Sequence, residues 1–237
     1  MIISLKKPPI FKNSIPFELK LSSKNNKDIS MHWQKVLQEK NDIFNGDVYV
    51  IVSLNKHSNQ LVLEISKTTY ATILYSSQTE KIKIHSLFSA LLLKTSDNFY
   101  VTIIDKDNQV NLLGGMASSQ DFNNKIYNPL SCIKRELEEE LGLNIFDQNT
   151  FKTFSLKYLK CPSVLNKNSD SIGTIYFAEL YLTRQELEEY YDTNKAFCDQ
   201  EIKFLNFNTK DDYMTLKAKI LPSRTYILDV IKALTKA

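Results

Sequence analysis

The residues of this chain most suited to chemistry lie in one acidic segment, residues 135–143, which reads Arg-Glu-Leu-Glu-Glu-Glu-Leu-Gly-Leu. Residues three and four apart are neighbours on an α-helix, so Glu136, Glu139 and Glu140 would project within one narrow sector. Carboxylates gathered in this way raise one another's proton affinity unless a cation is present. The segment therefore predicts a metal site on a helix.

The sequence marks both ends of that helix. Asn128 suits the N-cap, Pro129 suits the first helical position, and Gly142 suits the left-handed residue that closes a helix. An apolar stripe runs beside the acidic sector and consists of Leu130, Ile133, Leu137 and Leu141. We predict a helix from Pro129 to Leu141 that packs one side on a core and keeps the other side acidic.

A simpler interpretation is a solvated, salt-bridged helix face. Lys134 and Arg135 precede Glu138 and Glu139 by four residues, which is the spacing of helical ion pairs. However, glutamates in the last turn are disfavoured by the helix dipole, by roughly a few tenths of a kcal/mol each. We expect a cation to compensate and favour the metal site.

The ligand chemistry indicates a hard cation. Carboxylate oxygens suit Mg²⁺, with Mn²⁺ as an alternative, whereas zinc prefers histidine or cysteine at suitable spacing. The three histidines, His32, His57 and His85, lie far apart in the sequence and match no zinc motif. Because Mg²⁺ commonly binds few carboxylates together with substrate phosphates, the cluster points to phosphate chemistry.

Residues 135–143, with Gly114 and Gly115 upstream, resemble the Nudix box, the metal-binding loop and helix of hydrolases that act on nucleoside diphosphates linked to another group. The second half of the box matches completely. The chain has only five glycines, and three of them, Gly114, Gly115 and Gly142, fall in this region. The resemblance implies an α+β fold, an α/β/α sandwich with a mixed sheet.

The first half of the box departs from the family pattern. Tyr127 stands where the family usually has glutamate, Asp121 stands where it usually has glycine, and the spacing from Gly115 is about six residues too long. Either the box has degenerated and the protein no longer hydrolyses anything, or the chain belongs to a subgroup with an inserted loop that dispenses with the upstream glutamate. Since the downstream carboxylates are intact, we favour the second explanation.

The N-terminal region is similar to the UDP-glucose diphosphatase branch of Nudix proteins. The similarity rests on His32-Trp33, Phe44-Asn45-Gly46 and residues 61–70, which end in Thr-Thr-Tyr. It implies hydrolysis of a UDP-sugar such as UDP-glucose to UMP and a sugar 1-phosphate. Two alternatives stay open: an ADP-ribose or other nucleoside diphosphate derivative as substrate, and a noncatalytic protein that binds nucleotide sugars.

The resemblance also implies roles for individual residues. Glu136, Glu139 and Glu140 would bind the metal, Glu136 would serve as a ligand or as a base for the attacking water, and Arg135 would orient the carboxylates. Glu201 is a candidate for a further carboxylate from a facing loop, although we interpret it as a surface glutamate.

Composition sets broader bounds. A chain of 237 residues is long enough for a substantial core. Its net charge is only +3, and the sequence shows no dense Lys/Arg stripe of the kind typical of nucleic-acid binding. Three widely spaced cysteines argue against a disulfide framework, and no apolar run has the length of a membrane span. We expect a cytoplasmic enzyme that binds a small nucleoside diphosphate derivative, and neither nucleic acid nor a membrane. The oligomeric state is left open.

Periodicity and turn signals predict the remaining elements. We expect an N-terminal extension over residues 1–84, with one helix and an antiparallel hairpin, and a Nudix domain over residues 85–237. The polar residues 22–27 are expected to form a break before the first helix. The predicted helices are 29–39, 184–191 and 224–234, and the predicted strands are 48–54, a second through 65, 87–93, 99–104, 151–158, 172–182 and 202–207.

Overall fold

The computed structural model describes residues 1–39, 43–57, 60–79, 81–82, 84–104, 108–143, 149–161, 171–194, 201–206, 214, 216–217, 220 and 224–235. The helices are α1 (Ser23–Glu39), α2 (Tyr70–Thr79), α3 (Pro129–Leu141), α4 (Arg184–Asn194) and α6 (Tyr226–Thr235). The strands are β1 (Ile2–Ser4), β2 (Ile10–Glu18), β3 (Asp47–His57), β4 (Gln60–Thr69), β5 (His85–Lys94), β6 (Tyr100–Ile104), β7 (Val110–Asn111), β8 (Leu113–Met116), β9 (Phe122–Asn123), β10 (Ile126–Tyr127), β11 (Phe151–Lys160), β12 (Ile172–Leu180) and β13 (Glu201–Leu205). A short 3-10 turn, η1 (Ser119–Asp121), follows β8.

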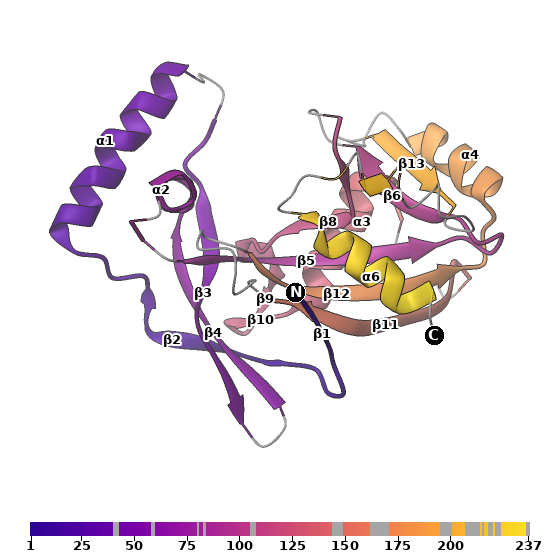
Figure 1. Cartoon of the computed structure of the whole chain (residues 1–237), viewed down its shortest axis with the longest axis horizontal. Helices are drawn as coiled ribbons and strands as arrows, with labels where there is room; N and C mark the ends of the chain where they lie inside the picture. The colour runs from indigo at the N-terminus through magenta and orange to yellow at the C-terminus, as the bar shows by residue number, and fades with distance from the viewer. Residues whose placement is uncertain are drawn as a thin grey trace.

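A mixed sheet organises the molecule (Figure 1). Its main path runs β1-β11-β12-β5-β3-β4-β2, and β6 and β8 also pair with β5. The pairs β12–β5 and β2–β4 are parallel, whereas the other pairs along this path are antiparallel. β5 is therefore the strand from which the sheet branches.

Helices cover both faces of the sheet around β5. Leu91 and Leu93 of β5 pack in a core with α3 and α4, whereas Ala90 and Leu92 pack in a second core with α6. This alternation places α3 and α6 on opposite faces, and Figure 1 shows α6 in front of the strands and α3 behind them. The predicted mixed sheet between helices is confirmed.

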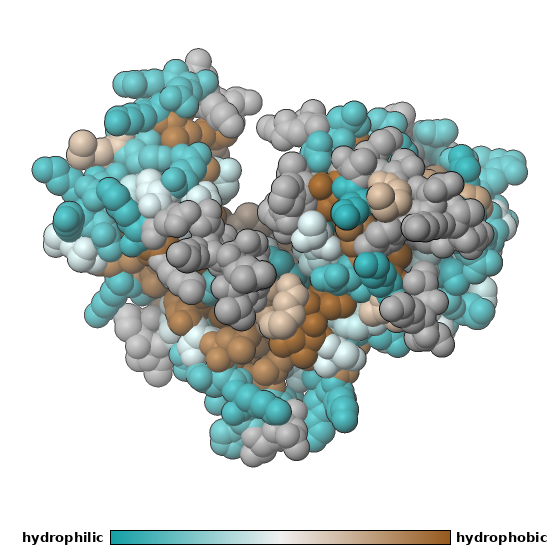
Figure 2. Space-filling view, viewed as in Figure 1, coloured by the Kyte–Doolittle hydropathy of each residue, from teal (hydrophilic) through white to brown (hydrophobic). Residues whose placement is uncertain are grey.

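The hairpin β3–β4 carries two helices of its own. α1 and α2 pack together on it through a cluster that includes Ile29, Trp33, Val36 and Tyr75. The predicted antiparallel hairpin is confirmed. Trp33 is buried in this cluster, whereas Met31 of the same helix is 56% exposed. Figure 2 shows α1 mainly hydrophilic over its visible surface.

The predicted break at residues 22–27 is wrong, because α1 begins at Ser23. Ser22 acts as the N-cap: its Oγ accepts a hydrogen bond from the backbone N–H of Asn25 at 3.1 Å. α2 was not predicted. Its start depends on a residue far away in sequence, since Asn45 Oδ1 accepts a hydrogen bond from the N–H of Ala71 at 2.8 Å.

Other boundaries shift for local reasons. The strand predicted to reach Leu182 ends at Leu180, and α4 follows after Thr183, whose N–H and hydroxyl donate to Glu186 Oε2 at 2.7 and 2.8 Å. The reciprocal bond from Glu186 N–H to Thr183 Oγ1 completes a capping box. The end of the predicted strand at Phe207, the turn residue Asn59 and Cys198 lie outside the described residues.

The N-terminal segment joins the main sheet. β1 pairs with β11, with Ile3 opposite Leu159, and β3 pairs with β5, with Val50 opposite Ser86. These pairings connect the proposed extension to the proposed Nudix domain, and the division at residue 84 stays a prediction. No helix in the described residues is both long and apolar enough to cross a membrane.

Replacing the cap residue, Ser22→Ala, should lower the free energy of unfolding by about 1 kcal/mol, because the N–H of Asn25 loses its partner. Urea unfolding followed by Trp33 fluorescence measures this, since Trp33 is the single tryptophan and lies on α1. The control is Ser30→Ala on the exposed middle of α1, where alanine should be neutral or mildly stabilising. Equal stability of the two variants would contradict the capping role.

Candidate functional site

α3 forms with the predicted boundaries. Asn128 Oδ1 accepts a hydrogen bond from Leu130 N–H at 3.1 Å, and Gly142 closes the helix with a φ of 68°. The N–H of Gly142 donates to Glu138 O at 3.1 Å, and the N–H of Leu143 donates to Leu137 O at 3.1 Å. Both ends are thus fixed by local hydrogen bonds.

The apolar side of α3 fixes its rotation. Ile133, Leu137 and Leu141 are buried in the core shared with β5 and β8. Cys132 is fully buried, and its thiol donates to Gly115 O at 3.5 Å. Burial raises the pKa of this thiol to about 12, so Cys132 is a packing residue rather than a nucleophile. With this side buried, Glu136 and Glu140 are directed toward β8.

Glu140 is a buried carboxylate, with 2% of the residue exposed. Its Oε2 accepts a hydrogen bond from the backbone N–H of Gly114 at 3.0 Å. Burial, and then the nearby charge of Glu136, raise its pKa to about 9, although the Gly114 bond acts in the opposite direction. This position would be stabilised by a cation.

Glu136 lies directly against Gly115. An added Cβ on Gly115 would overlap the Glu136 carboxylate, so any larger residue there would displace this carboxylate from its place beside β8. Burial raises the pKa of Glu136, and the neighbouring Arg135 charge lowers it. The glycine pair that the sequence singled out therefore contacts both inward glutamates.

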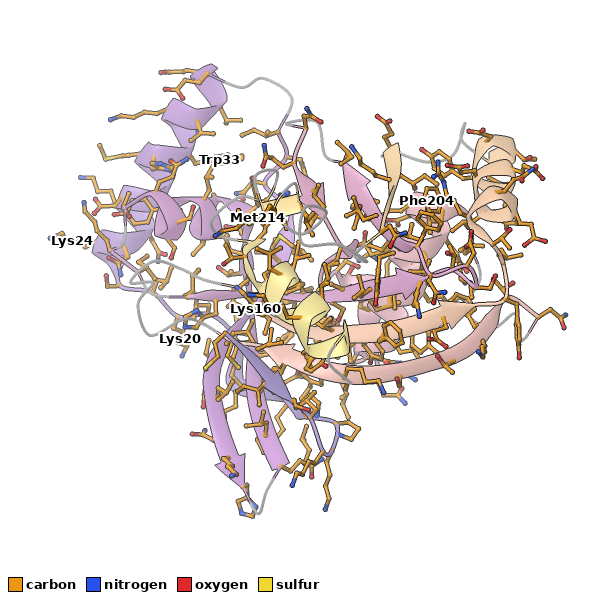
Figure 3. The ribbon with its side chains drawn as sticks, turned by 45° about the vertical axis from the view of Figure 1, so that its right-hand side comes forward. Lys20, Lys24, Trp33, Lys160, Phe204 and Met214 are labelled. Carbon is orange, nitrogen blue, oxygen red and sulfur yellow. The ribbon has the colours of Figure 1, made fainter. Side chains whose placement is uncertain are left out.

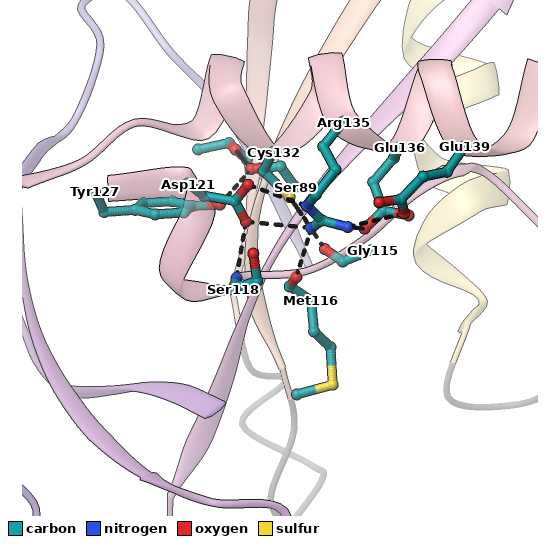
Figure 4. Close-up of polar contacts among 11 residues, drawn as sticks. Ser89, Gly115, Met116, Ser118, Asp121, Tyr127, Cys132, Arg135, Glu136 and Glu139 are labelled. Atoms are coloured by element: carbon teal, nitrogen blue, oxygen red, sulfur yellow. Dashed lines mark hydrogen bonds and ion pairs between the residues drawn. The ribbon is translucent and has the colours of Figure 1, made fainter. Parts of the chain in front are cut away.

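Arg135 connects the acidic residues (Figure 4). Its Nη1 lies 2.7 Å from Glu136 Oε1 and 3.1 Å from Glu139 Oε2, and its Nη2 donates to Met116 O at 3.1 Å. The predicted pair of Lys134 with Glu138 is also present, at 3.8 Å. Arg135 thus orients Glu136 and Glu139 and fixes α3 to the end of β8.

Asp121 is a site residue that the sequence analysis missed. Its side chain is 1% exposed, and its two oxygens accept hydrogen bonds from Arg135 Nε and Nη2, both at 3.2 Å. Asp121 Oδ2 also accepts from the N–H of Ser118 at 2.8 Å, which fixes η1. A carboxylate within the longer loop could have indicated this role. The sequence analysis noted only that Asp121 stands where the family usually has glycine.

Tyr127, where the family usually has glutamate, lies in the core instead. It is 2% exposed, its hydroxyl is 2.7 Å from Ser89 Oγ, and its ring packs against Phe11 and Phe122. The site therefore has a carboxylate partner for Arg135, but that partner comes from η1.

The structure brings some of the predicted ligands together and leaves others apart. Glu136 and Glu140 converge on Gly114 and Gly115, whereas the Glu139 side chain is 52% exposed and turned toward Arg135. Within the described ranges, no group of three or more His, Cys, Asp or Glu side chains is arranged to hold a metal ion. Glu201 is exposed at the start of β13, in keeping with its interpretation as a surface residue.

No family model and no curated protein matches the chain. Solved structures with a similar course of the chain are described as Nudix hydrolases. One is Tm1382, a putative Nudix hydrolase, at 12% identity and a TM-score of 0.46; the match covers 86% of this chain and 96% of that one. Another is a Nudix hydrolase from Nitrosomonas europaea, at 11% identity and a TM-score of 0.38; the match covers 63% of this chain and 89% of that one.

Another solved structure with a similar course of the chain is a bifunctional NMN adenylyltransferase/ADP ribose pyrophosphatase from Francisella tularensis, at 11% identity and a TM-score of 0.41. The match covers 64% of this chain and spans 42% of that protein's length. A further structure of the same bifunctional protein is a complex with AMP and a manganese ion. Similarity at this level concerns the course of the chain alone.

Replacing Asp121 with Asn should lower the free energy of unfolding by roughly 3 kcal/mol, because it removes the most deeply buried of the carboxylates that pair with Arg135. The matched control is Glu188→Gln in the exposed i,i+4 pair with Arg184, which should cost less than about 1 kcal/mol. Urea unfolding measures both changes in the free energy of unfolding. Equal changes would show that the buried Asp121–Arg135 pair stabilises the fold no more than an exposed ion pair does.

Glu140 should make the metal-free protein less stable at high pH. Folding raises its pKa from 4.5 to about 9, so its stabilising contribution is fully present below the unfolded value and is lost as the pH rises through the folded one. Glu140→Gln removes this titration, and its melting temperature in EDTA should decline less than that of the wild type between about pH 5 and pH 9. Glu138→Gln, in an exposed ion pair of the same helix, should keep the wild-type slope. Identical slopes for all three proteins would refute the assignment.

Proposed function

We propose that this chain is a divalent-metal-dependent hydrolase that cleaves the phosphoanhydride of a nucleoside diphosphate derivative. The observation that carries this proposal is the convergence of Glu136 and Glu140 of α3 on the glycine pair of β8. It is supported by the complete second half of the box at residues 135–143, and it agrees with the similarity in chain course to Nudix hydrolases.

The donor set fits a hard cation. Two largely buried carboxylates repel each other, and burial raises the pKa values of both. Bound Mg²⁺ or Mn²⁺ would offset the free energy needed to keep both carboxylates ionised. Glu136 and Glu140 would hold the ion together with Glu139, whose exposed side chain would have to turn from Arg135. When bound, the metal would neutralise diphosphate oxygens and favour ionisation of an attacking water.

The protein's own residues would position the reacting groups. The N–H of Gly114 holds Glu140, and Arg135 holds Glu136, so neither carboxylate has to be reoriented when substrate arrives. Glu136 would act as a ligand or as the base for the water. Arg135, which Asp121 holds from the other side, is a positioning residue.

We propose a UDP-sugar as the substrate, with UDP-glucose giving UMP and glucose 1-phosphate. This choice rests on the similarity of residues 32–33, 44–46 and 61–70 to the UDP-glucose diphosphatase branch. Within the described residues, Asn45 accepts a hydrogen bond at the start of α2, which is a structural role. ADP-ribose and other nucleoside diphosphate derivatives therefore belong in the same substrate panel.

One observation favours a second candidate, a noncatalytic nucleotide-sugar-binding protein. Glu136 and Glu139 both form ion pairs with Arg135, and these pairs compete with metal binding. Such a protein would bind nucleotide sugars tightly and release no product during long incubation with Mg²⁺ or Mn²⁺.

Purified protein with Mg²⁺ should release UMP from UDP-glucose, and Glu140→Gln should lower the rate by more than about 100-fold. This expectation follows because even outer-shell partners of a metal contribute 10- to 100-fold. Product identity is read by chromatography over a panel that includes ADP-ribose. Glu138→Gln is the matched control, since Glu138 lies on the same helix but pairs with Lys134 at the surface.

Two results would overturn the proposal. Folded protein that turns over no nucleoside diphosphate derivative with either metal would exclude the hydrolase. Full activity of Glu140→Gln would show that the carboxylates of α3 are not the metal site.

A further inference from the structure

A cavity of about 320 Å³ lies against the other face of the glycine strand β8. Gly114, Gly115 and Met116 form one wall, and Phe88 of β5 and Tyr226 of α6 contribute aromatic rings. Phe88 and Tyr226 belong to the core on the α6 side of the sheet, whereas Glu136 and Glu140 come from α3 on the opposite side. The volume is within the range of small-molecule sites.

The aromatic rings suit a planar ligand. The ring centroids of Phe88 and Tyr226 are 5.9 Å apart with an interplanar angle of 54°. Phe88 packs down on Gly173 of β12, where an added Cβ would overlap its ring and push it into the cavity. Gly173 therefore keeps this space open beside an aromatic surface on which a nucleobase stacks well.

Two cationic side chains lie at the cavity. Arg224 lines it, and none of the lining residues that the structure describes is an aspartate or a glutamate. Lys160 of β11 is 2% exposed, and its Nζ donates to the carbonyl oxygen and the Oγ of Ser171, a lining residue, at 2.7 and 3.0 Å. The same Nζ lies 5.6 Å from the centroid of the Tyr226 ring. Figure 3 shows Lys160 next to α6, the helix that carries Tyr226. A buried lysine behind the wall and an arginine in the wall favour an anionic ligand.

The cavity and the acidic site share the glycine pair. Gly114 lines the cavity and donates its N–H to Glu140, and Gly115 lines the cavity and contacts Glu136. Among the described residues β8 pairs with β5 alone, so its other edge is not part of a strand ladder. A ligand in the cavity is separated from the carboxylates by the thickness of one backbone strand.

We propose that this cavity binds the nucleotide half of the substrate, a nucleoside monophosphate unit. The base packs on Phe88 and Tyr226, and the phosphate lies toward Arg224 and the glycine pair, so the scissile anhydride reaches the edge of β8 next to Glu136 and Glu140. The assignment of this half to the substrate rests on the proposed hydrolase function, whereas the binding of a nucleotide by the cavity is measured independently.

The test is isothermal titration of the full-length protein in EDTA with UMP, AMP, CMP and GMP. At least one nucleotide should bind, and both Arg224→Gln and Phe88→Leu should weaken it by about 10-fold or more, since each removes a contact to a different part of the ligand. Phe88→Tyr keeps the ring and should retain binding. Arg184→Gln, on the exposed surface of α4, is the charge-matched control and should bind as the wild type does.

The variants separate this inference from the proposed function. Glu140→Gln should lose turnover and keep nucleotide binding, because Glu140 lies on the other side of β8. Arg224-dependent nucleotide binding without any hydrolysis would sustain the cavity assignment and overturn the hydrolase. Nucleotide affinity and KM unchanged within about twofold in both folded cavity variants, or no binding of any of the four nucleotides, would overturn the cavity assignment.

Discussion

A largely buried guanidinium determines the geometry of the acidic site. Arg135 is 18% exposed and lies between Asp121 on one side and Glu136 and Glu139 on the other. Burial alone would lower the pKa of Arg135, but the hydrogen bonds that it donates to Asp121 and the charges of Glu136 and Asp121 raise this pKa above its ordinary value. Because this ion cannot leave its partners cheaply, α3, η1 and the end of β8 are held in one arrangement. The charge of Arg135 also offsets the repulsion between the carboxylates of Glu136 and Glu139.

The sequence predicted those features of the site whose causes are local. The bounds of α3 follow from Asn128, Pro129 and Gly142, each of which acts within one turn of the helix. Asp121 could not be assigned, since its partner Arg135 is 14 residues away and the intervening loop has no periodic pattern. Counting positions from the box identified Tyr127 only as a residue that replaces a glutamate, whereas the structure shows Tyr127 in the core and Asp121 of η1 in contact with Arg135.

The same distinction applies to the fold. β5 was recognised from its apolar composition, because both of its faces are buried between helices. The apolar residues of α2 (Tyr70–Thr79) are not gathered on one side of the helix, and its first turn is capped by Asn45, 26 residues away in sequence. The segment itself therefore has no pattern that predicts a helix. β1 was overlooked because three residues become a strand only when β11 offers an edge. In each case the deciding contact is distant in sequence.

The glycine pair separates the acidic face from the cavity by one strand of backbone. An added Cβ would overlap the Glu136 carboxylate at Gly115 and the backbone of β5 at Gly114, so neither position accepts side chains without a shift. Without them, the strand is only backbone thick, and its N–H at Gly114 faces Glu140 while its opposite surface faces the cavity. A negative site and a positive site therefore lie one strand apart, with Glu136 and Glu140 on one side and Arg224 and Lys160 on the other. A ligand with one anionic end and one end that binds through a cation would be oriented by this charge asymmetry, because each end is favoured on a different side of β8.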